Sequence, residues 1–343
     1  MTRDTGPARL GLTPVGFDRL TGWGDDRVSA VVPVFLKSCA RRSKEPNSTA
    51  ADWQALCRAA AALPAGDDMA ARHFFQSAFG PVAVTDYGAA DGLFTGYYEI
   101  ELNGSRKRQG RYQTPIYRRP PDLGVAPKLS RAAIEDGALA GRGLELFWVD
   151  DPIDAFFLQI QGSGRIRLRD GRTVRVGYDG QNGLPYVAVG RLLVERGIMP
   201  RDKVTMVAIR KWMKDHPKAG AALRREDPSY VFFRDIHGDG PIGAEHVVLT
   251  AARSLAVDPA FIALGTPVWL DARERFAPND EVRRLVVAQD TGGAIKGPVR
   301  GDLYWGTGEA AGDRAGRMNA RGRYYLLLPR PVADRLAAEA PWR

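Results

Sequence analysis

The spacing of apolar and polar residues divides the chain into a helical opening and a long β-rich remainder. Residues 50–57 carry apolar side chains at intervals of three and four, which predicts a helix. A helix is also expected over 33–42, because Pro33 suits a first helical turn. A third helix is expected over 70–79, because Asp67 and Asp68 precede it as N-terminal caps. The first part of the chain is therefore expected to be helical.

From residue 92 onward the pattern changes to short apolar or alternating runs separated by glycine, proline and aspartate, which is typical of strands joined by tight turns. Strands are expected over 92–102, 111–117, 144–149, 156–161, 165–169, 173–178, 230–233, 247–249, 254–259, 266–270, 285–288, 302–306 and 324–328. Helices are expected over 131–137, 186–196 and 202–215, and a polar loop over 309–314. Short mixed strands with glycine turns favour a small closed barrel.

Composition is that of a globular protein rich in turns. Hydrophobic residues make up 44% of the chain and charged residues 26%, and the 38 glycines and 23 prolines favour β structure. A length of 343 residues allows two domains. No apolar run approaches the roughly 18 residues that span a bilayer, and residues 1–11 lack the apolar segment of a signal peptide.

The net charge of +9 suits a polyanionic partner. Because the basic residues are scattered rather than clustered, nucleic acid is a weak candidate, and an acidic membrane surface or cell-wall polymer fits better. The two cysteines, Cys39 and Cys57, have no metal-ligand spacing with each other or with a histidine, so no metal site or cofactor is expected. Whether they are free thiols or a disulfide is left open by the sequence.

Residues 288–306, AQDTGGAIKGPVRGDLYWG, hold the main candidate chemistry. A buried apolar strand delivers Asp290 to its end, a glycine turn and Lys296 follow, and Asp302 opens an aromatic strand. Carboxylates set among apolar and aromatic groups tend to hold their protons longer than free ones, which suits acid catalysis. Each aspartate alone is better explained as a turn cap, but the pair in this setting predicts a site.

Other candidate groups lie earlier in the chain. Aromatic residues such as Tyr98, near Glu99, and those near Thr114 fit either a sugar groove or one face of a sheet, and Glu99 is a rival catalytic carboxylate. Gly162-Ser163-Gly164 is expected to be a hairpin loop that binds a ligand through its amides and hydroxyl. A strand is expected after it, so it lacks the strand–turn–helix context of a nucleophile elbow.

Several motifs, in order along the chain, resemble one family of bacterial cell-wall enzymes. SLAVDPAFIALGTPVWL, AQDTGGAIKG and GDLYWG resemble a three-aspartate domain of glycan-cleaving enzymes, whose acids match Asp258, Asp290 and Asp302. TGYYEIEL, RYQTPIYRRP, FFLQIQGSGRIRL and DPSYVFF are also present. Over residues 92–328 the chain resembles the membrane-bound lytic transglycosylase A family.

The resemblance implies a mainly β fold with N-terminal helices, in which a double-psi β-barrel domain is formed by residues 1–118 and 234–343. A second β-rich domain, residues 119–233, is implied to be inserted and to bind substrate, with the glycan in the groove between the two domains. The composition break at Pro120-Pro121 agrees with that boundary.

The implied activity is that of a peptidoglycan lytic exotransglycosylase, a lyase. It cleaves the β-1,4 bond between N-acetylmuramic acid (MurNAc) and N-acetylglucosamine (GlcNAc) without water and leaves 1,6-anhydroMurNAc ends. Asp302 is implied to act as the acid and then as the base, while Asp290 sets its charge environment. No cofactor or metal is implied. The candidate substrate-binding residues are Thr114, Gln161, Ser163, Asp258, Lys296 and Tyr98.

Two other interpretations stay open at this point. One is a hydrolase on the same scaffold, with Glu99 or Asp290 as the base, and the other is a catalytically idle cell-wall-binding module. The expected partners are peptidoglycan glycan strands and, as further candidates, proteins of cell-wall synthesis or division, with no nucleic acid. A monomer in the periplasm, associated with the outer membrane, is expected, although neither a signal peptide nor a lipid-attachment cysteine is visible in the sequence.

Overall fold

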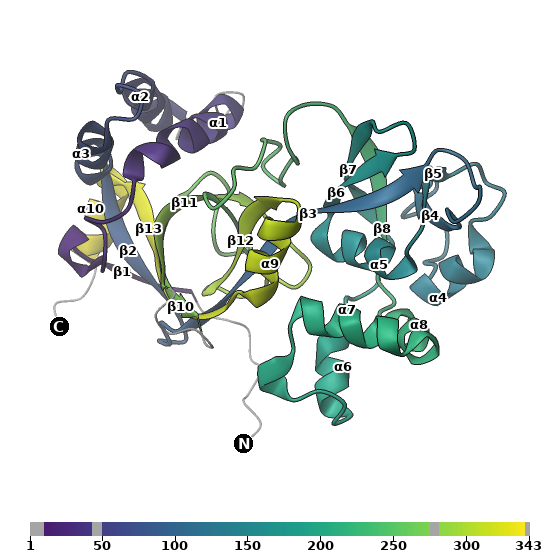
Figure 1. Cartoon of the computed structure of the whole chain (residues 1–343). Helices are drawn as coiled ribbons and strands as arrows, with labels where there is room; N and C mark the ends of the chain where they lie inside the picture. The colour runs from purple at the N-terminus through teal and green to yellow at the C-terminus, as the bar shows by residue number, and fades with distance from the viewer. Residues whose placement is uncertain (1–9, 43–49, 275–280, 340–343) are drawn as a thin grey trace. The chain divides into compact units, whose positions relative to one another are not determined.

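The computed structural model describes residues 10–42, 50–274 and 281–339, which form two compact units (Figure 1). Unit 1 holds the described residues up to Gly96, residues Ile242–Trp305 and those from Met318 onward; unit 2 holds Tyr97–Pro241 and Gly306–Arg317. Strand β3 passes from one unit into the other. These limits differ from the domain boundaries expected at 118/119 and 233/234, which stay a prediction.

Unit 1 contains most of the strands and the N-terminal helices. Its elements are β1 (Leu10–Pro14), two 3-10 turns (Phe17–Arg19 and Val28–Val31), α1 (Val32–Arg42), α2 (Ala50–Ala61), α3 (Asp68–Ala78), β2 (Phe79–Asp86), the start of β3 (Gly92–Ser105), β9 (Ser254–Ala256), β10 (Pro267–Glu274), β11 (Glu281–Asp290), most of β12 (Arg300–Thr307), β13 (Asn319–Pro329) and α10 (Arg330–Glu339). The expected cap of α3 is present, since the Asp67 side chain accepts a hydrogen bond from the Ala70 N–H.

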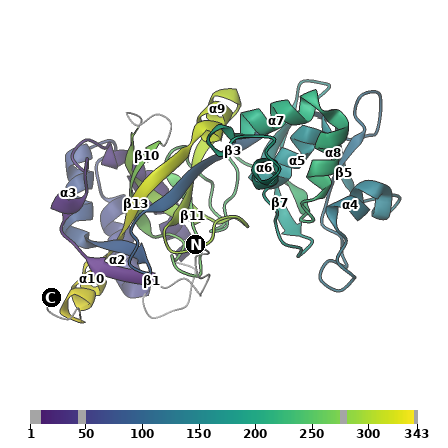
Figure 2. The same ribbon diagram turned by 90° about the horizontal axis from the view of Figure 1, so that it is seen from below.

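The strands of unit 1 close into a ring. They follow the order β13-β10-β11-β9-β12-β3, and β3 pairs back onto β13, with Thr95 opposite Asn319. Strands β2 and β1 continue the sheet from β13, and α10 packs against both of them (Figure 2). The expectation of a mainly β chain with N-terminal helices and a closed sheet is confirmed.

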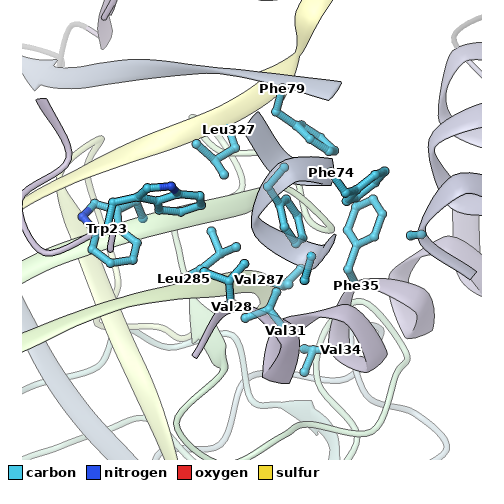
Figure 3. Close-up of a cluster of buried hydrophobic side chains, with 14 of the residues drawn as sticks. Trp23, Val28, Val31, Val34, Phe35, Phe74, Phe79, Leu285, Val287 and Leu327 are labelled. Atoms are coloured by element: carbon cyan, nitrogen blue, oxygen red, sulfur yellow. The ribbon is translucent and has the colours of Figure 1, made fainter. Parts of the chain in front are cut away.

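Strand β11 is buried on both faces, which explains its unbroken apolar sequence. Val286 and Ala288 contribute to the core cluster that also contains Leu255, Leu303 and Tyr324. The alternate residues Leu285 and Val287 pack instead against the N-terminal helices, beside Trp23, Phe35 and Phe74 (Figure 3). The helices thus cover the ring and shield the strand that ends at Asp290.

A disulfide joins α1 to α2 in the same region. Cys39 and Cys57, which the sequence left unresolved between thiols and a bridge, are bonded to each other. They lie 18 residues apart in the chain, and closing a loop of that size stabilises the folded state by roughly 3 kcal/mol in the chain-entropy model. The bond therefore fixes the helices that cover β11.

Unit 2 combines a smaller set of strands with several helices. Its elements are the end of β3, β4 (Thr114–Tyr117), α4 (Arg131–Ala133) with a following π turn (Ile134–Ala138), β5 (Glu145–Val149), α5 (Pro152–Gln161), β6 (Ser163–Leu168), β7 (Thr173–Gln181), α6 (Val189–Glu195), a 3-10 turn (Arg201–Lys203), α7 (Met206–Asp215), α8 (Pro217–Arg225), β8 (Val231–Ile236), the end of β12 and α9 (Glu309–Arg317). The strand order is β3-β6-β7-β8, and β5 pairs with β3 and β4.

The strand expected over 156–161 is wrong, because these residues form the second half of helix α5. Asp151 caps this helix by accepting a hydrogen bond from the Ile153 N–H, and Pro152 occupies its first turn. Gly162 ends it with a φ of 74°, a left-handed conformation that favours glycine. Consequently Gly162-Ser163-Gly164 joins a helix to a strand and is not the expected hairpin loop.

Two smaller expectations are also wrong. Residues 309–314, expected to be a loop, belong to helix α9. Residues 247–249 form no regular strand and contribute only an isolated bridge between Val248 and Ile242. Helix α7 ends before Pro217, as expected, and Pro217 then begins helix α8, where proline fits because the first turn needs no N–H partner.

Candidate active site

The three aspartates expected from the sequence gather around Ala256 of β9. Strand β9 lies between β11 and β12, and Ala256 pairs with Asp290 on one side and with Asp302 on the other. Asp258 follows two residues after Ala256. The backbones of Asp290 and Asp302 are thus two strand spacings apart, roughly 10 Å. Residues in register across neighbouring strands project on the same face, so strand pairing brings the acids together.

Asp302 is half-buried and held by a short hydrogen-bonded chain. The Thr95 hydroxyl donates to Asp302 Oδ1 at 2.7 Å, and Arg300 Nη2 donates to Thr95 Oγ1 at 2.8 Å. Arg300 therefore fixes the direction in which the Thr95 hydroxyl points. Among the residues that the structure describes, none donates a hydrogen bond to Asp302 Oδ2. That oxygen is the one available to exchange a proton with a ligand.

The surroundings of Asp302 favour its protonated form. Burial raises the pKa of Asp302 to about 6, although the positive charge of Arg300 and the hydrogen bond from Thr95 oppose the rise. The negative charge of Asp290 adds a smaller rise. A carboxyl group with a pKa close to the working pH can both donate and accept a proton, which a general acid–base catalyst requires.

Backbone amides hold the other two aspartates. Asp290 Oδ1 accepts hydrogen bonds from the N–H groups of Ala244 and Thr291, both at 2.9 Å. Asp258 is buried, and its Oδ2 accepts from the Gly297 N–H at 2.9 Å. Each carboxylate therefore orders a loop beside the strands, which for Asp290 agrees with the turn-cap interpretation. The charge of Asp290 also raises the pKa of Asp302.

A buried polar network links Asp290 to helix α1. The neighbouring residue Gln289 accepts a hydrogen bond from Ser254 Oγ at 2.6 Å and donates to Ser38 Oγ at 2.9 Å. Ser38 in turn donates to Glu245 Oε2 at 2.6 Å, and the Glu245 N–H donates to the Gln289 carbonyl at 3.1 Å. Glu245 follows Ala244, so this network positions the loop that donates to Asp290.

Three candidate binding residues come together in unit 2. Gln161 ends α5, and its Oε1 accepts a hydrogen bond from the Tyr98 N–H at 2.9 Å. Ser163 begins β6 and is buried, and the buried Tyr98 hydroxyl accepts from Arg210 Nη1 at 3.4 Å. Gln161 thus fixes the backbone at Tyr98, next to the start of β6.

Thr114 and Lys296 lie elsewhere. Thr114 is half-buried and pairs with Val149, which lies opposite Gly104 of β3. Gly164, the residue after Ser163, pairs instead with Ile100 of β3. Gly104 and Ile100 are four residues apart on β3, a separation of roughly 13 Å along the strand. Lys296 is exposed in the turn that follows β11 in unit 1. Within the described residues, no group of three or more His, Cys, Asp or Glu side chains is arranged to hold a metal ion.

Sequence models of two domains match the chain: the MltA specific insert domain over residues 93–234 and the 3D domain over residues 253–328. The membrane-bound lytic murein transglycosylase A of Escherichia coli K12 is 38% identical over 275 residues, which cover 78% of this chain and 73% of that protein. This chain belongs to the membrane-bound lytic murein transglycosylase A family. Its relative from Vibrio cholerae serotype O1 is 34% identical over 257 residues, which cover 73% of this chain and 68% of the relative.

Solved structures of the family share the fold. A membrane-bound lytic murein transglycosylase from Agrobacterium tumefaciens superposes with a TM-score of 0.86 at 32% identity, covering 95% of this chain and 99% of that one. E. coli MltA with bound chitohexaose gives a TM-score of 0.72 at 31% identity, covering 95% of each chain. In the described part of the chain, no helix is long and apolar enough to cross a membrane.

Glu99, the rival carboxylate, is engaged in a buried ion pair. It has no exposed surface, and it accepts hydrogen bonds from Arg175 Nε at 2.5 Å and from Arg175 Nη2 at 3.3 Å. The Thr307 hydroxyl donates to the same carboxylate at 2.9 Å. Protonation of Glu99 would break this pairing, and removing one partner of a buried ion pair is strongly destabilising. Its geometry suits a structural role in unit 2 better than that of a base.

Two residues of the site were not singled out from the sequence. Thr95 begins the TGYYEIEL motif, and Arg300 stands two positions before Asp302. Alternation along β12 places Arg300 and Asp302 on the same face, and that signal was available in the sequence. The pairing of β12 with β3, which brings Thr95 to Asp302, depends on tertiary structure.

The raised pKa of Asp302 predicts a pH-dependent cost to stability. A carboxyl group with a higher pKa in the folded state stabilises the fold at low pH, and this contribution is lost as the pH rises through about 6. Asp302→Asn mimics the protonated form, so its melting temperature should exceed that of the native protein at pH 7.5 and match it near pH 4. Thermal unfolding across this range measures the difference.

The matched control is Asp170→Asn. Asp170 is exposed, and its hydrogen bonds with Arg172 lower its pKa, so its replacement should show no gain in stability with rising pH. A gain for Asp302→Asn that does not change with pH would contradict the raised pKa of Asp302.

Proposed function

We propose that this protein is a lytic transglycosylase that cleaves the β-1,4 bond between MurNAc and GlcNAc in peptidoglycan without water. The observation that carries the proposal is the half-buried Asp302 carboxyl, oriented by Thr95 and with a pKa of about 6. Family membership supports the reaction class, and the bound chitohexaose in the structure of the E. coli relative supports a glycan substrate.

A single carboxyl group is sufficient for this reaction. Asp302 donates its proton to the glycosidic oxygen as the bond from that oxygen to C1 of the muramoyl residue breaks. The C6 hydroxyl of the same residue then forms a bond to C1, and its proton passes to the Asp302 carboxylate. The catalyst regains its proton, no water is consumed, and the product carries a 1,6-anhydro ring.

The reaction needs no second catalytic carboxylate, because the substrate supplies its own nucleophile. Ordinary glycosidases pair an acid with a nucleophile or base. Here the attacking hydroxyl belongs to the substrate, and an intramolecular nucleophile gains a large effective concentration. Asp302 can therefore serve both proton transfers, with Oδ2 as the oxygen that exchanges the proton.

Asp290 supports this chemistry without exchanging a proton. Its charge raises the pKa of Asp302, and its backbone hydrogen bonds fix its position. The ion pair of Glu99 with Arg175 argues against a hydrolase that uses Glu99 as base. We assign substrate binding to the residues expected from the sequence, namely Thr114, Gln161, Ser163, Asp258, Lys296 and Tyr98, and substrate binding more broadly to the inserted domain at 119–233. Exolytic action is part of the same proposal.

The location of the protein is proposed on two grounds. The Cys39–Cys57 disulfide favours an oxidising compartment such as the periplasm, where peptidoglycan lies. The names of the relatives, which call them membrane-bound, support an association with a membrane, and we propose that it is the outer membrane. A monomeric state and contacts with proteins of cell-wall synthesis or division stay predictions.

Asp302→Asn tests the acid–base assignment. The amide cannot donate and accept the required proton, so turnover of purified peptidoglycan should fall by about 10²–10⁴-fold while glycan binding persists. Mass spectrometry of the native digest should find 1,6-anhydroMurNAc ends. Reducing MurNAc ends would identify a hydrolase instead, and intact binding without any released product would identify an idle binding module.

Asp290→Asn tests the electrostatic role of Asp290. Removing its negative charge should lower the pKa of Asp302, so the protonated catalyst is lost at a lower pH. The limb of the kcat/KM profile on which activity falls with rising pH should therefore move toward acid. An unchanged profile would assign Asp290 only to the loop that it caps.

A further inference from the structure

A cavity of about 800 Å³ in unit 2 is lined by none of the residues to which a catalytic or substrate-binding role was assigned individually above. It is lined by the first residues of α5, by the end of α7 and by one face of α8. Pro217, Ala221 and Arg224 of α8 contribute to it at the spacing of residues that share a helix face. Helix α7 contacts both α5 and α8 in the fold (Figures 1 and 2).

Arg224 is a buried cation without a partner. Only 8% of its surface is exposed, yet its guanidinium makes no hydrogen bond or ion pair with any described residue. Burial lowers the pKa of Arg224, although the more distant charges of Glu135 and Asp151 oppose this effect. The Arg224 nitrogens are not among the buried polar atoms that lack a partner, so they reach the solvent that fills the cavity, where a ligand can take the place of water.

Arg131 of the same unit shows how a structural arginine is satisfied. It is 2% exposed, and its guanidinium donates to the Asp227 carbonyl at 3.0 Å and to the Ser229 carbonyl at 2.6 Å. It also pairs with the Asp227 carboxylate at 3.4 Å. Arg224 has no such set of acceptors, so its donors face the cavity without protein partners.

The acidic side chains that line the cavity are already occupied. Asp150 pairs with Arg111 at 3.4 Å. Asp151 caps α5 and lies 3.5 Å from Lys214. Asp154, the third acid of the lining, forms an ion pair with Arg210. Arg224 is therefore the charged residue of the lining that has no ion-pair partner among the described residues.

Helix α8 adds to the positive field. Its first residue, Pro217, lines the cavity, and the preceding residue, His216, supplies no side-chain cap. The amino end of a helix carries a partial positive charge and unpaired N–H groups, which attract anions. Pro217 and Arg224 are seven residues apart on α8, roughly 10 Å along the helix, so the amino end contributes only to the field of the cavity, and Arg224 is the group that can pair with the ligand.

We propose that this cavity binds a carboxylate, with its two oxygens paired to the guanidinium of Arg224. The planar fork of arginine donors matches a carboxylate in two parallel hydrogen bonds. The cavity volume admits the end of a short peptide. A carboxylate of this kind can come from a stem peptide of peptidoglycan, a source that rests on the proposed function, or from a small free acid.

The test is calorimetric titration of the full chain with N-acetyl-D-Ala-D-Ala and with its C-terminal amide, at constant ionic strength. The acid should bind at least about tenfold more tightly than the amide, because only the acid forms charge-assisted hydrogen bonds. Sodium acetate is the second probe. If acetate binds and the peptide acid does not, the cavity is a carboxylate site for a small free acid. If neither acetate nor the peptide acid binds, the proposal is overturned.

Two variants locate the site. Arg224→Gln should weaken binding of whichever acid binds by about tenfold or more, and Arg224→Lys, which keeps the charge without the fork, should also weaken it. Lys218→Gln is the matched control, since it removes an exposed charge from the same helix outside the cavity. Equal losses in Lys218→Gln and Arg224→Gln, or no loss in either Arg224 variant, would overturn the assignment.

A stability measurement separates a binding residue from a structural one. An unpaired buried charge opposes folding, so Arg224→Met should melt at or above the temperature of the native protein when no carboxylate is present. It should also lose the rise in melting temperature that the bound acid gives the native chain. A lower melting temperature with an unchanged response to the acid would identify Arg224 as structural.

Discussion

The geometry of the candidate site depends on the position of β9, which pairs with β11 on one side and with β12 on the other. Ala256 is the residue that both neighbours share, so Asp290 and Asp302 face each other across it. Burial holds this arrangement in place, because β11 packs into the ring through Val286 and against the N-terminal helices through Leu285. A site built on paired strands is positioned more rigidly than one built on loops alone.

Burial of Asp302 favours catalysis but opposes the stability of the fold. Burial raises its pKa and gives the acid that the reaction needs, but a buried carboxyl group weakens the fold at neutral pH. Thr95 and Arg300 limit this penalty by supplying a hydrogen bond and a nearby positive charge. Supporting contacts extend outward through Gln289 and Ser38 to helix α1. Such a trade of stability for activity is common at functional sites.

Sequence patterns anticipated the parts of the structure that depend on local order. The unbroken apolar run before Asp290 was a buried strand, and Asp67 capped α3 as its position indicated. The apolar run at 156–161 is a helix and not the expected strand, because short apolar segments suit a buried helix as well as a strand. The capping residue Asp151, the proline after it and the terminating Gly162 are the local signals in the sequence that favour the helix.

The remaining features required the three-dimensional structure. Whether Cys39 bonds to Cys57 depends on their distance, which no pattern in the sequence gives. The contact of Thr95 with Asp302 joins residues more than 200 positions apart. The lack of partners around Arg224 is a property of the folded unit, because a list of residues does not reveal which acceptors each arginine reaches.

The central claim is that Asp302 is a carboxyl group with a pKa raised by burial, and its titration tests this claim most directly. Carbon-13 NMR of side-chain carboxyl groups, assigned by comparison with Asp302→Asn, gives the pKa of Asp302 in the native protein. The structure predicts a midpoint at about 6. A midpoint near 4, the ordinary value for an exposed aspartate, would contradict the account.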